Sequence, residues 1–335
     1  MSSHPLLLYR DLHDLAERVA AGPPDEKHPV VLACDPAHHA ALAGVLADRV
    51  IAPMRRPDIH TRPAAALAEY HRHARQLKRD ATAVTIIAQP DPGTAPRAWI
   101  RAARCEAAVD LTADDSSMHL ICAYPTSLPE PLLTSVLSTH AVLMTRDGAQ
   151  PNQRHTNPAA VLIRHSPHRP VPAPAQPPVL HIAGSETIQD LHQILRQITA
   201  HLAQTPTLIR TDFVAAVNEI LTNGYLHGAP PLQVTLWVGD QEVDCRVTDH
   251  GRGRPDPTAG YRARTSSRRA GAGLWLARQL CDDIDTWRHD GTFTVRAATS
   301  TAAPRNRQHN GAHARAETAH TRAALITARS RLWHP

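Results

Sequence analysis

The sequence predicts two domains of mixed structure: a first α/β domain with a mainly parallel sheet and helices on both faces, and a second domain of the α+β type. Its 335 residues fit two domains of ~100 to 200 residues better than one. In the first half, short apolar runs alternate with helical patterns, which favours parallel strands joined by helices. We predict a first domain at 1–163, a linker at 164–179, a second domain at 180–300 and a tail at 301–335.

The linker is expected to be extended and semi-rigid, with polyproline character. Proline lacks an amide donor and fixes φ, so neither a helix nor a central strand can hold many of them. The segment contains Pro167, Pro170, Pro172, Pro174, Pro177 and Pro178.

Strand and helix patterns in the first domain follow one another in order. The expected strands are 29–34, 83–88, 119–123 and 141–144, and the expected helices are 37–50, 64–77 and 132–139. A glycine-rich phosphate loop is not found, because residues 21–25 before the first strand hold two prolines, which remove backbone donors that a phosphate needs. The sequence therefore indicates no catalytic machinery in this half.

Composition and charge are those of an ordinary soluble protein. Hydrophobic residues make up 42% of the chain and aromatic residues only 4%, so we expect cores of Ala, Val, Leu and Ile. The formal net charge is +5, but residues 301–335 hold six arginines and one acid, Glu317, so the remaining body is formally neutral. A neutral body lacks the basic face needed to bind nucleic acid directly. We expect the basic tail to be disordered.

Cysteine and histidine usage gives no sign of a disulfide framework or a metal centre. The five cysteines include no Cys-x-x-Cys pair, and their odd number indicates a reducing compartment. Of the 23 histidines, the nearest neighbours are His38, His39, His71 and His73, with no Cys or carboxylate at ligand spacing, so we expect surface histidines. No signal peptide and no run of ~18 apolar residues is present, which predicts a cytoplasmic protein without a membrane span.

The second domain opens with two predicted amphipathic helices, 186–204 and 211–226. On the second helix, Glu219, Asn223 and His227 stand four residues apart, so they share one polar face. An amide oxygen suits Mg²⁺, which bridges substrate phosphates, and a carboxylate can take the proton of an attacking hydroxyl group. Taken alone, this pair is weak evidence for a nucleotide site, because Glu and Asn at this spacing are common on a solvated helix face.

A predicted hairpin follows, with strands at 232–238 and 242–248. Its second strand ends in Asp249-His-Gly251-Arg-Gly253. Asp249 can accept a hydrogen bond from an adenine amino group, while the two glycines let the chain curve around the base. The same motif is also a common turn.

A second glycine motif begins the last predicted helix, which runs to residue 283. Gly271-Ala272-Gly273-Leu274 exposes amide donors at the positive end of that helix, which is a place for phosphates. The polar stretch before it is long for a loop and predicts a mobile lid, in which most arginines are expected to be solvated. Those arginines are Arg262, Arg264, Arg268 and Arg269. Gly291-Thr292 then opens a closing strand.

The order of these motifs resembles the N, G1 and G2 boxes and the terminal strand of the GHKL ATPase superfamily, and looks most like its anti-sigma regulatory serine kinase branch. The resemblance implies a Bergerat-type sandwich that binds ATP and Mg²⁺. It makes Glu219 the catalytic base and Asn223 the Mg²⁺ ligand, has Asp249 bind adenine, and has Thr292 assist Asp249. The nucleotide-lining residues it implies are Gly251, Gly253, Gly271, Ala272, Gly273 and Leu274.

The first domain resembles the MEDS sensory domain found ahead of signalling modules. The likeness spans roughly residues 3–160 and rests on residues 4–10, 120–125, 128–132 and 139–140. It implies a small-molecule or redox sensor, while an α/β domain that only docks a partner fits the pattern equally well.

Three functions follow from these resemblances. The first is an anti-sigma factor that binds a sigma factor and phosphorylates a serine or threonine of an anti-anti-sigma protein, alone or as a homodimer. The second is a noncatalytic module whose partner binding depends on ATP. The third, a histidine kinase, ranks last, because neither His192 nor His201 lies in a phosphoacceptor hairpin. Gly224 within the second helix is expected to loosen it at a cost of ~1 kcal/mol.

Overall fold

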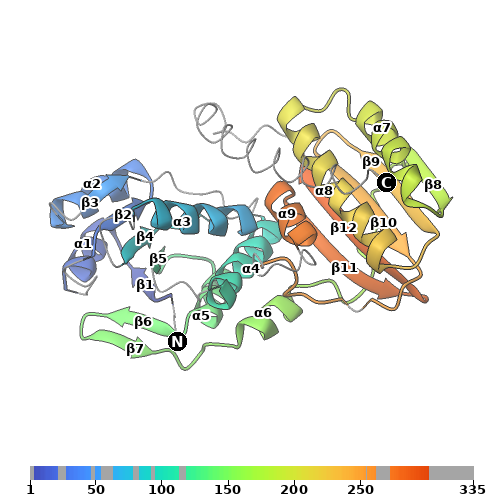
Figure 1. The fold of residues 1–335 in the computed structure, drawn as a ribbon. Coiled ribbons are helices and arrows are strands. Elements are labelled where there is room, and N and C mark those ends of the chain that lie inside the picture. The colour runs from blue at the N-terminus through green and yellow to red at the C-terminus, as the bar shows by residue number, and fades with distance from the viewer. Residues whose placement is uncertain are drawn as a thin grey trace.

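The computed structural model describes residues 4–21, 28–46, 50–53, 63–77, 83–91, 95–112, 118–253, 255–261 and 272–301. Within these residues the chain forms a seven-stranded sheet from its first half and a five-stranded sheet from its second half (Figure 1). The predicted lid arginines, Gly271 and the tail beyond Thr301 lie outside the described residues. Our domain boundaries stay a prediction.

The first sheet is mainly parallel, as expected. Its order is β3-β2-β4-β5-β1-β6-β7, and every neighbouring pair is parallel except β6 with β7. The strands are β1 (Leu6–Tyr9), β2 (Val30–Ala33), β3 (Val50–Pro53), β4 (Val84–Ala88), β5 (Met118–Pro125), β6 (Val142–Thr145) and β7 (Gly148–Pro151). The four strands predicted for this half are therefore present, and β1 lies between two of them.

Helices cover both faces of this sheet, because alternate strand residues enter two separate cores. Leu7 and Leu32 join one core with Leu15 of α1 (Leu12–Ala21) and Leu42 of α2 (Pro36–Leu46). Leu6 and Val31 join the other core, which includes residues of α3 (Pro63–Leu77), α4 (Pro96–Thr112) and α5 (Glu130–Thr139). A shorter helix, α6 (Pro158–Arg164), packs against α4. Helices thus lie on both faces, as predicted, but the helix expected at 37–50 ends at Leu46 and Val50 already belongs to β3.

The second sheet is antiparallel throughout, in the order β11-β12-β10-β9-β8. Its strands are β8 (Leu180–Ser185), β9 (Leu232–Val238), β10 (Glu242–Asp249), β11 (Asp283–His289) and β12 (Thr292–Ser300). Three helices cover one face: α7 (Leu191–His201), α8 (Thr207–His227) and α9 (Ala272–Leu280) (Figure 1). Helices and sheet share one apolar core, which makes this part an α+β sandwich.

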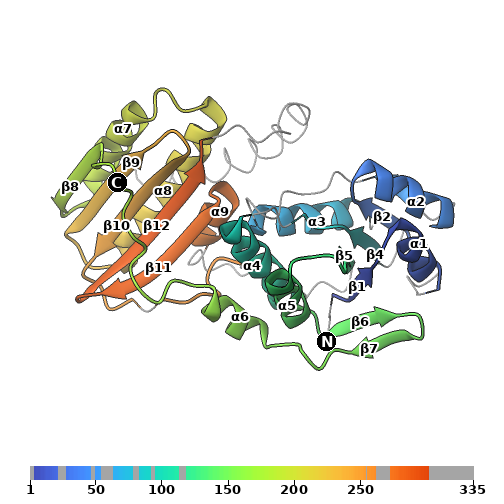
Figure 2. The ribbon, with the colours of Figure 1, turned by 180° about the vertical axis from the view of Figure 1, so that it is seen from behind.

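The proline-rich segment lies against the second sheet, on the face away from the helices (Figure 2). Its carbonyl oxygens still accept hydrogen bonds although its prolines have no amide donor. Arg246 of β10 donates to the carbonyls of Val171 and Pro172, both at 2.8 Å. The amide of Val179 donates to Leu236 at 2.9 Å. The segment is extended, as expected, and these contacts fix its path.

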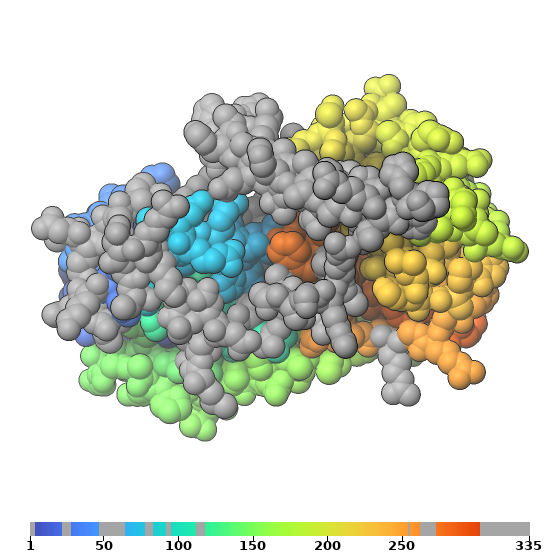
Figure 3. Space-filling model, in the orientation of Figure 1, coloured from blue at the N-terminus to red at the C-terminus, as the bar shows by residue number. Residues whose placement is uncertain are grey.

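Ion pairs join α4 of the first half to the second sheet. Arg101 pairs with Asp283 at 2.5 Å, and Arg104 pairs with Asp285 at 3.0 Å, all four side chains being largely buried. Burial alone would raise the pKa of Asp283, but hydrogen bonding and charge from Arg101 lower it below its usual range. On another side α3 packs against α9, and Figure 3 shows the two helices side by side. The two halves are thus in direct contact.

Among the described helices, none combines the length and the apolar character needed to cross a bilayer. None of the five cysteines forms a disulfide.

Candidate functional site

Helix α8 carries the acid and the amide that the sequence singled out. It runs without a break from Thr207 to His227. Glu219 is 8% exposed, Asn223 is half-buried and His227 is exposed. One helical turn separates Glu219 from Asn223, about 6 Å along the axis. A carboxylate that is nearly buried needs polar groups beside it. The helix that follows in the chain, α9, lies next to Glu219.

That neighbour is the start of α9. A β-carbon on Gly273 would lie 2.6 Å from Oε2 of Glu219 and 3.3 to 3.4 Å from the amide group of Asn223. The bare backbone of Gly273 therefore touches both side chains, and any larger residue would have to push them away. Because this is the first turn of α9, its unpaired amide groups and positive dipole end lie beside the acid and the amide.

Ala272 is the first residue of α9, and Leu274 is partly buried against the core of this half. Gly271, the first glycine of the motif, falls outside the described residues.

Asp249 ends β10 and is buried between two glycine backbones. Its Oδ1 accepts hydrogen bonds from the amides of Gly251 at 2.6 Å and Ala229 at 3.3 Å. A β-carbon on Gly228 would come within 2.8 Å of Oδ2, and one on Gly251 within 2.6 Å of Oδ1. Within the part of the chain that the structure describes, both donors go to Oδ1, which leaves Oδ2 able to accept a further hydrogen bond.

Arg288 of β11 holds the glycine turn in place, although no motif in the sequence indicates this residue. Its guanidinium donates to the carbonyl of Gly251 at 2.6 Å, to Gly253 at 3.4 Å and to Gly291 at 3.1 Å. Gly253 also packs on the ring of Phe293, where a β-carbon would lie 3.5 Å away. No spacing in the sequence links Arg288 to this turn, because β12 lies between their strands.

Thr292 is not brought to Asp249. Its hydroxyl donates to the carbonyl of His289 at 2.7 Å, across the turn between β11 and β12. In the β10–β12 ladder, Asp249 stands opposite Phe293. A role for Thr292 beside Asp249 therefore stays a prediction with no contact to support it.

Gly224 does not loosen α8, contrary to expectation. A β-carbon there would lie 3.1 and 3.2 Å from the two methyl groups of Leu232 on β9. The glycine thus permits close packing of α8 on β9. Trp237 and Trp287 are buried, as expected for packing residues, and both lie beside the guanidinium of Arg246.

The prediction that the neighbouring histidines of the first half lie at the surface is wrong for His38. His38 is largely buried and bonds to Asp35 at 2.9 Å and to Tyr9 at 2.8 Å. His4 and His140, which no spacing marked, are also buried.

Comparisons with known proteins find a family match in the second half of the chain. The family model of the histidine kinase-like ATPase domain matches residues 184–299. Among solved structures, the RsbU and RsbW domains of Rv1364c from Mycobacterium tuberculosis match at 22% identity and a TM-score of 0.29, over 38% of this chain and 34% of that one. This chain thus spans about a third of that structure. No curated protein matches. Residues 184–299, which hold Glu219, Asn223 and Asp249, therefore match the histidine kinase-like ATPase domain family.

Proposed function

We propose that residues 180–300 bind ATP with Mg²⁺ and act as a serine/threonine protein kinase of the anti-sigma type toward an anti-anti-sigma protein, with a sigma factor as second partner. The first domain is proposed as a MEDS-like sensory domain that controls this activity. One observation carries the proposal: inside the matched region, the acid and amide of α8 touch the glycine start of α9, while Asp249 is clamped between glycine backbones.

The residues present fit a nucleotide. Gly273 and Gly251 occupy places where a β-carbon would collide with Glu219 or Asp249, so in both cases the backbone itself lies close to the acid. Oδ2 of Asp249 can accept from the amino group of adenine, because Oδ1 already serves the two backbone amides. Asn223 offers a neutral oxygen to Mg²⁺.

The remaining roles follow from these positions. Bound ATP supplies the phosphoryl group that is transferred. Glu219 accepts the proton of the partner's hydroxyl group, since it lies on the same helix face as Asn223. The first amides of α9 stabilise negative charge on phosphate oxygens. The glycine turn at 251–253, held by Arg288, lines the base. Positioning and charge neutralisation are the main contributions that phosphoryl transfer requires.

The contacts between the two halves support control by the first domain. Arg101 and Arg104 on α4 are tied to Asp283 and Asp285 of β11, and α3 packs on α9. Helix α9 carries Gly273, so a shift of α3 or α4 would reach the acid and amide of α8. These contacts are sufficient to couple the first domain to the proposed nucleotide site.

The test is a transfer assay with the full chain and the proteins recovered with it from its native host. Glu219→Gln should keep ATP binding within about threefold and lower transfer at least 100-fold, the usual contribution of a general base. Glu186→Gln, an exposed glutamate outside the site, is the matched control and should transfer normally. Unchanged phosphorylation by Glu219→Gln would remove the assigned base.

A noncatalytic ATP-dependent binding module is the second candidate, and the burial of Glu219 favours it. A carboxylate that is 8% exposed and lies against the start of α9 offers little surface to a partner's serine. This candidate predicts that nucleotide changes partner affinity while Glu219→Gln and the wild type bind the partner equally.

A further inference from the structure

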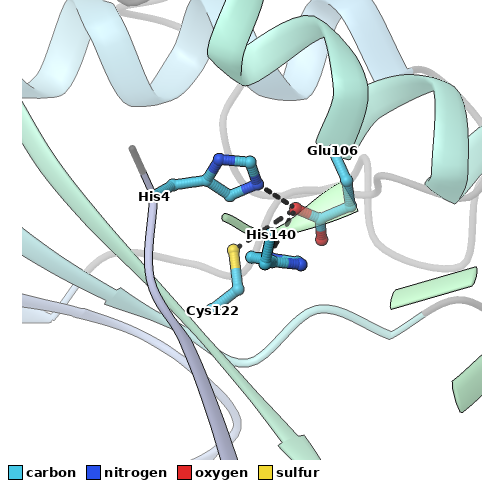
Figure 4. A group of neighbouring side chains, drawn as sticks. All are labelled: His4, Glu106, Cys122 and His140. Atoms are coloured by element: carbon cyan, nitrogen blue, oxygen red, sulfur yellow. Dashed lines mark hydrogen bonds and ion pairs between the residues drawn. The ribbon is translucent and has the colours of Figure 1, made fainter. Parts of the chain in front are cut away.

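Four buried side chains with metal-ligand chemistry meet in the core of the first domain. His4 precedes β1, Glu106 lies on α4, Cys122 lies on β5 and His140 follows α5. Each residue is at most 3% exposed, and one ligand atom from each lies within 4.8 Å of the other three. Figure 4 shows three of them pointing at the carboxylate of Glu106. The distances to its Oε2 are 3.1 Å from Nε2 of His4 and 3.4 Å from both Nε2 of His140 and Sγ of Cys122.

The second ring nitrogen of His140 fixes its tautomer. Nδ1 lies 2.7 Å from the carbonyl oxygen of Val136, which can only accept, so Nδ1 carries a proton. In the neutral ring, Nε2 of His140 carries a lone pair; this atom is fully buried and has no hydrogen-bond partner among the residues that the structure describes. It faces Oε2 of Glu106 at 3.4 Å, an oxygen that also carries lone pairs, and either a proton or a bound metal ion would relieve this contact.

The surroundings orient the other ligands in the same direction. Nδ1 of His4 lies 2.7 Å from Oδ1 of Asp110, so its Nε2 points into the cluster. The hydroxyl of Tyr124 donates to Oε1 of Glu106 at 2.6 Å, which turns Oε2 toward the same point. Outer partners of this kind, a carboxylate or carbonyl on the far nitrogen of each histidine, are typical of metal-binding histidines.

We propose that His4, Glu106, Cys122 and His140 bind one divalent transition-metal ion of the Zn²⁺ class. A tetrahedral ion with bonds of about 2.0 to 2.3 Å holds its ligand atoms about 3.3 to 3.8 Å apart. The three distances to Oε2 of Glu106 are already close to that range, so the four ligands need move by only about 1 Å. Two imidazoles, a thiolate and a carboxylate suit Zn²⁺ and its substitute Co²⁺ better than Mg²⁺ or Ca²⁺.

The site is closed and of structural type, since four protein ligands complete a tetrahedron and leave no position for substrate. None of these four residues belongs to the proposed nucleotide site. Glu106 and Arg104 lie two residues apart on α4, so loading the site bears on the helix that pairs with Asp285.

The test uses the full chain, unfolded with a chelator, and refolded with one equivalent of Co²⁺ because the site is buried. The wild type should retain one ion after desalting and show intense visible absorption of tetrahedral Co²⁺ with a thiolate-to-metal charge-transfer band. Cys122→Ser should lose that band. Cys105→Ser, which changes a neighbouring buried thiol outside the cluster, should keep it.

A positioning variant separates ligation from packing. Asp110→Asn should keep the charge-transfer band but bind Zn²⁺ about 10- to 100-fold more weakly in competition with a chelator, as expected for an outer partner. Failure of refolded wild type to retain Co²⁺ would show that the cluster is only a hydrogen-bond network. A band that survives Cys122→Ser would overturn the proposed ligand set, because another thiolate would then bind the ion.

Discussion

Asp249→Asn tests the adenine contact most sharply, because the change keeps the shape of the side chain and reverses one hydrogen-bonding group. The amides of Gly251 and Ala229 both need an acceptor, so the asparagine must place its carbonyl oxygen where Oδ1 now lies. Its NH₂ group then takes the place of Oδ2, beside Gly228. The local fold is kept, but a donor now faces the amino group of adenine.

The expected loss follows from one charged hydrogen bond. Such a bond contributes about 1.5 to 3 kcal/mol, which corresponds to roughly 10- to 150-fold weaker ATP binding. Inosine triphosphate carries a carbonyl oxygen in place of the amino group, so the variant should bind it better than ATP. Isothermal titration with both nucleotides measures the two affinities, with exposed Asp240→Asn as control. A folded variant whose ATP affinity is unchanged, or which loses both nucleotides equally, would refute the contact.

Three further predictions concern the surroundings of the site. In Gly273→Ala, the new β-carbon would lie 2.6 Å from Oε2 of Glu219, so the carboxylate must move by about 0.8 Å to reach an ordinary contact distance. Phosphoryl transfer should fall about 100-fold with little change in melting temperature. Normal transfer by this variant would refute the close approach. Arg288→Ala should weaken nucleotide binding roughly tenfold in calorimetry, because the glycine turn loses its charged donor. A loss of folding free energy as large as the loss of binding free energy would indicate that Arg288 has only a structural role. The pKa of Asp283 is lower in the folded state than in the unfolded state, so its ionised carboxylate stabilises the fold. This contribution is full above the ordinary pKa of about 3.9 and is lost as pH falls through the lower folded value. Urea unfolding at a series of pH values should show this loss of stability, and Asp283→Asn should abolish that part of the pH dependence.

Local patterns sufficed for much of the fold. The period-two alternation of β9 and β10 and the helical spacing of α8 depend on neighbours a few residues away. The predicted bounds of the two strands agree closely with the observed ones, whereas α8 begins about one turn before its predicted start, at Thr207. The alternation of apolar runs and helical patterns also predicted the parallel sheet. The motifs on α8, β10 and α9 could be predicted because each contains its own residues at short spacing.

Long-range pairing could not be predicted. Strand β11 carries buried acids, Asp283 and Asp285, which look unsuited to a sheet until Arg101 and Arg104 from the other half neutralise them. Strand β8 is short and pairs with β9 through a register shift, so its alternation is weak. Arg288 reaches the glycine turn across an intervening strand.

The buried cluster was missed for the same physical reason. His4 and His140 are brought together only by the sheet order β5-β1-β6, and Glu106 comes from a helix that packs on it. None of their spacings resembles a metal motif. By contrast, the histidines that do lie near one another in the sequence include His38, which is satisfied by Asp35 and Tyr9.

Calorimetric titration of the full chain with ATP at millimolar Mg²⁺ tests the central claim most directly. The account predicts saturable binding at one site per chain, which weakens markedly when Mg²⁺ is removed and also in Asn223→Ala. A folded protein that takes up no adenine nucleotide under these conditions would contradict it.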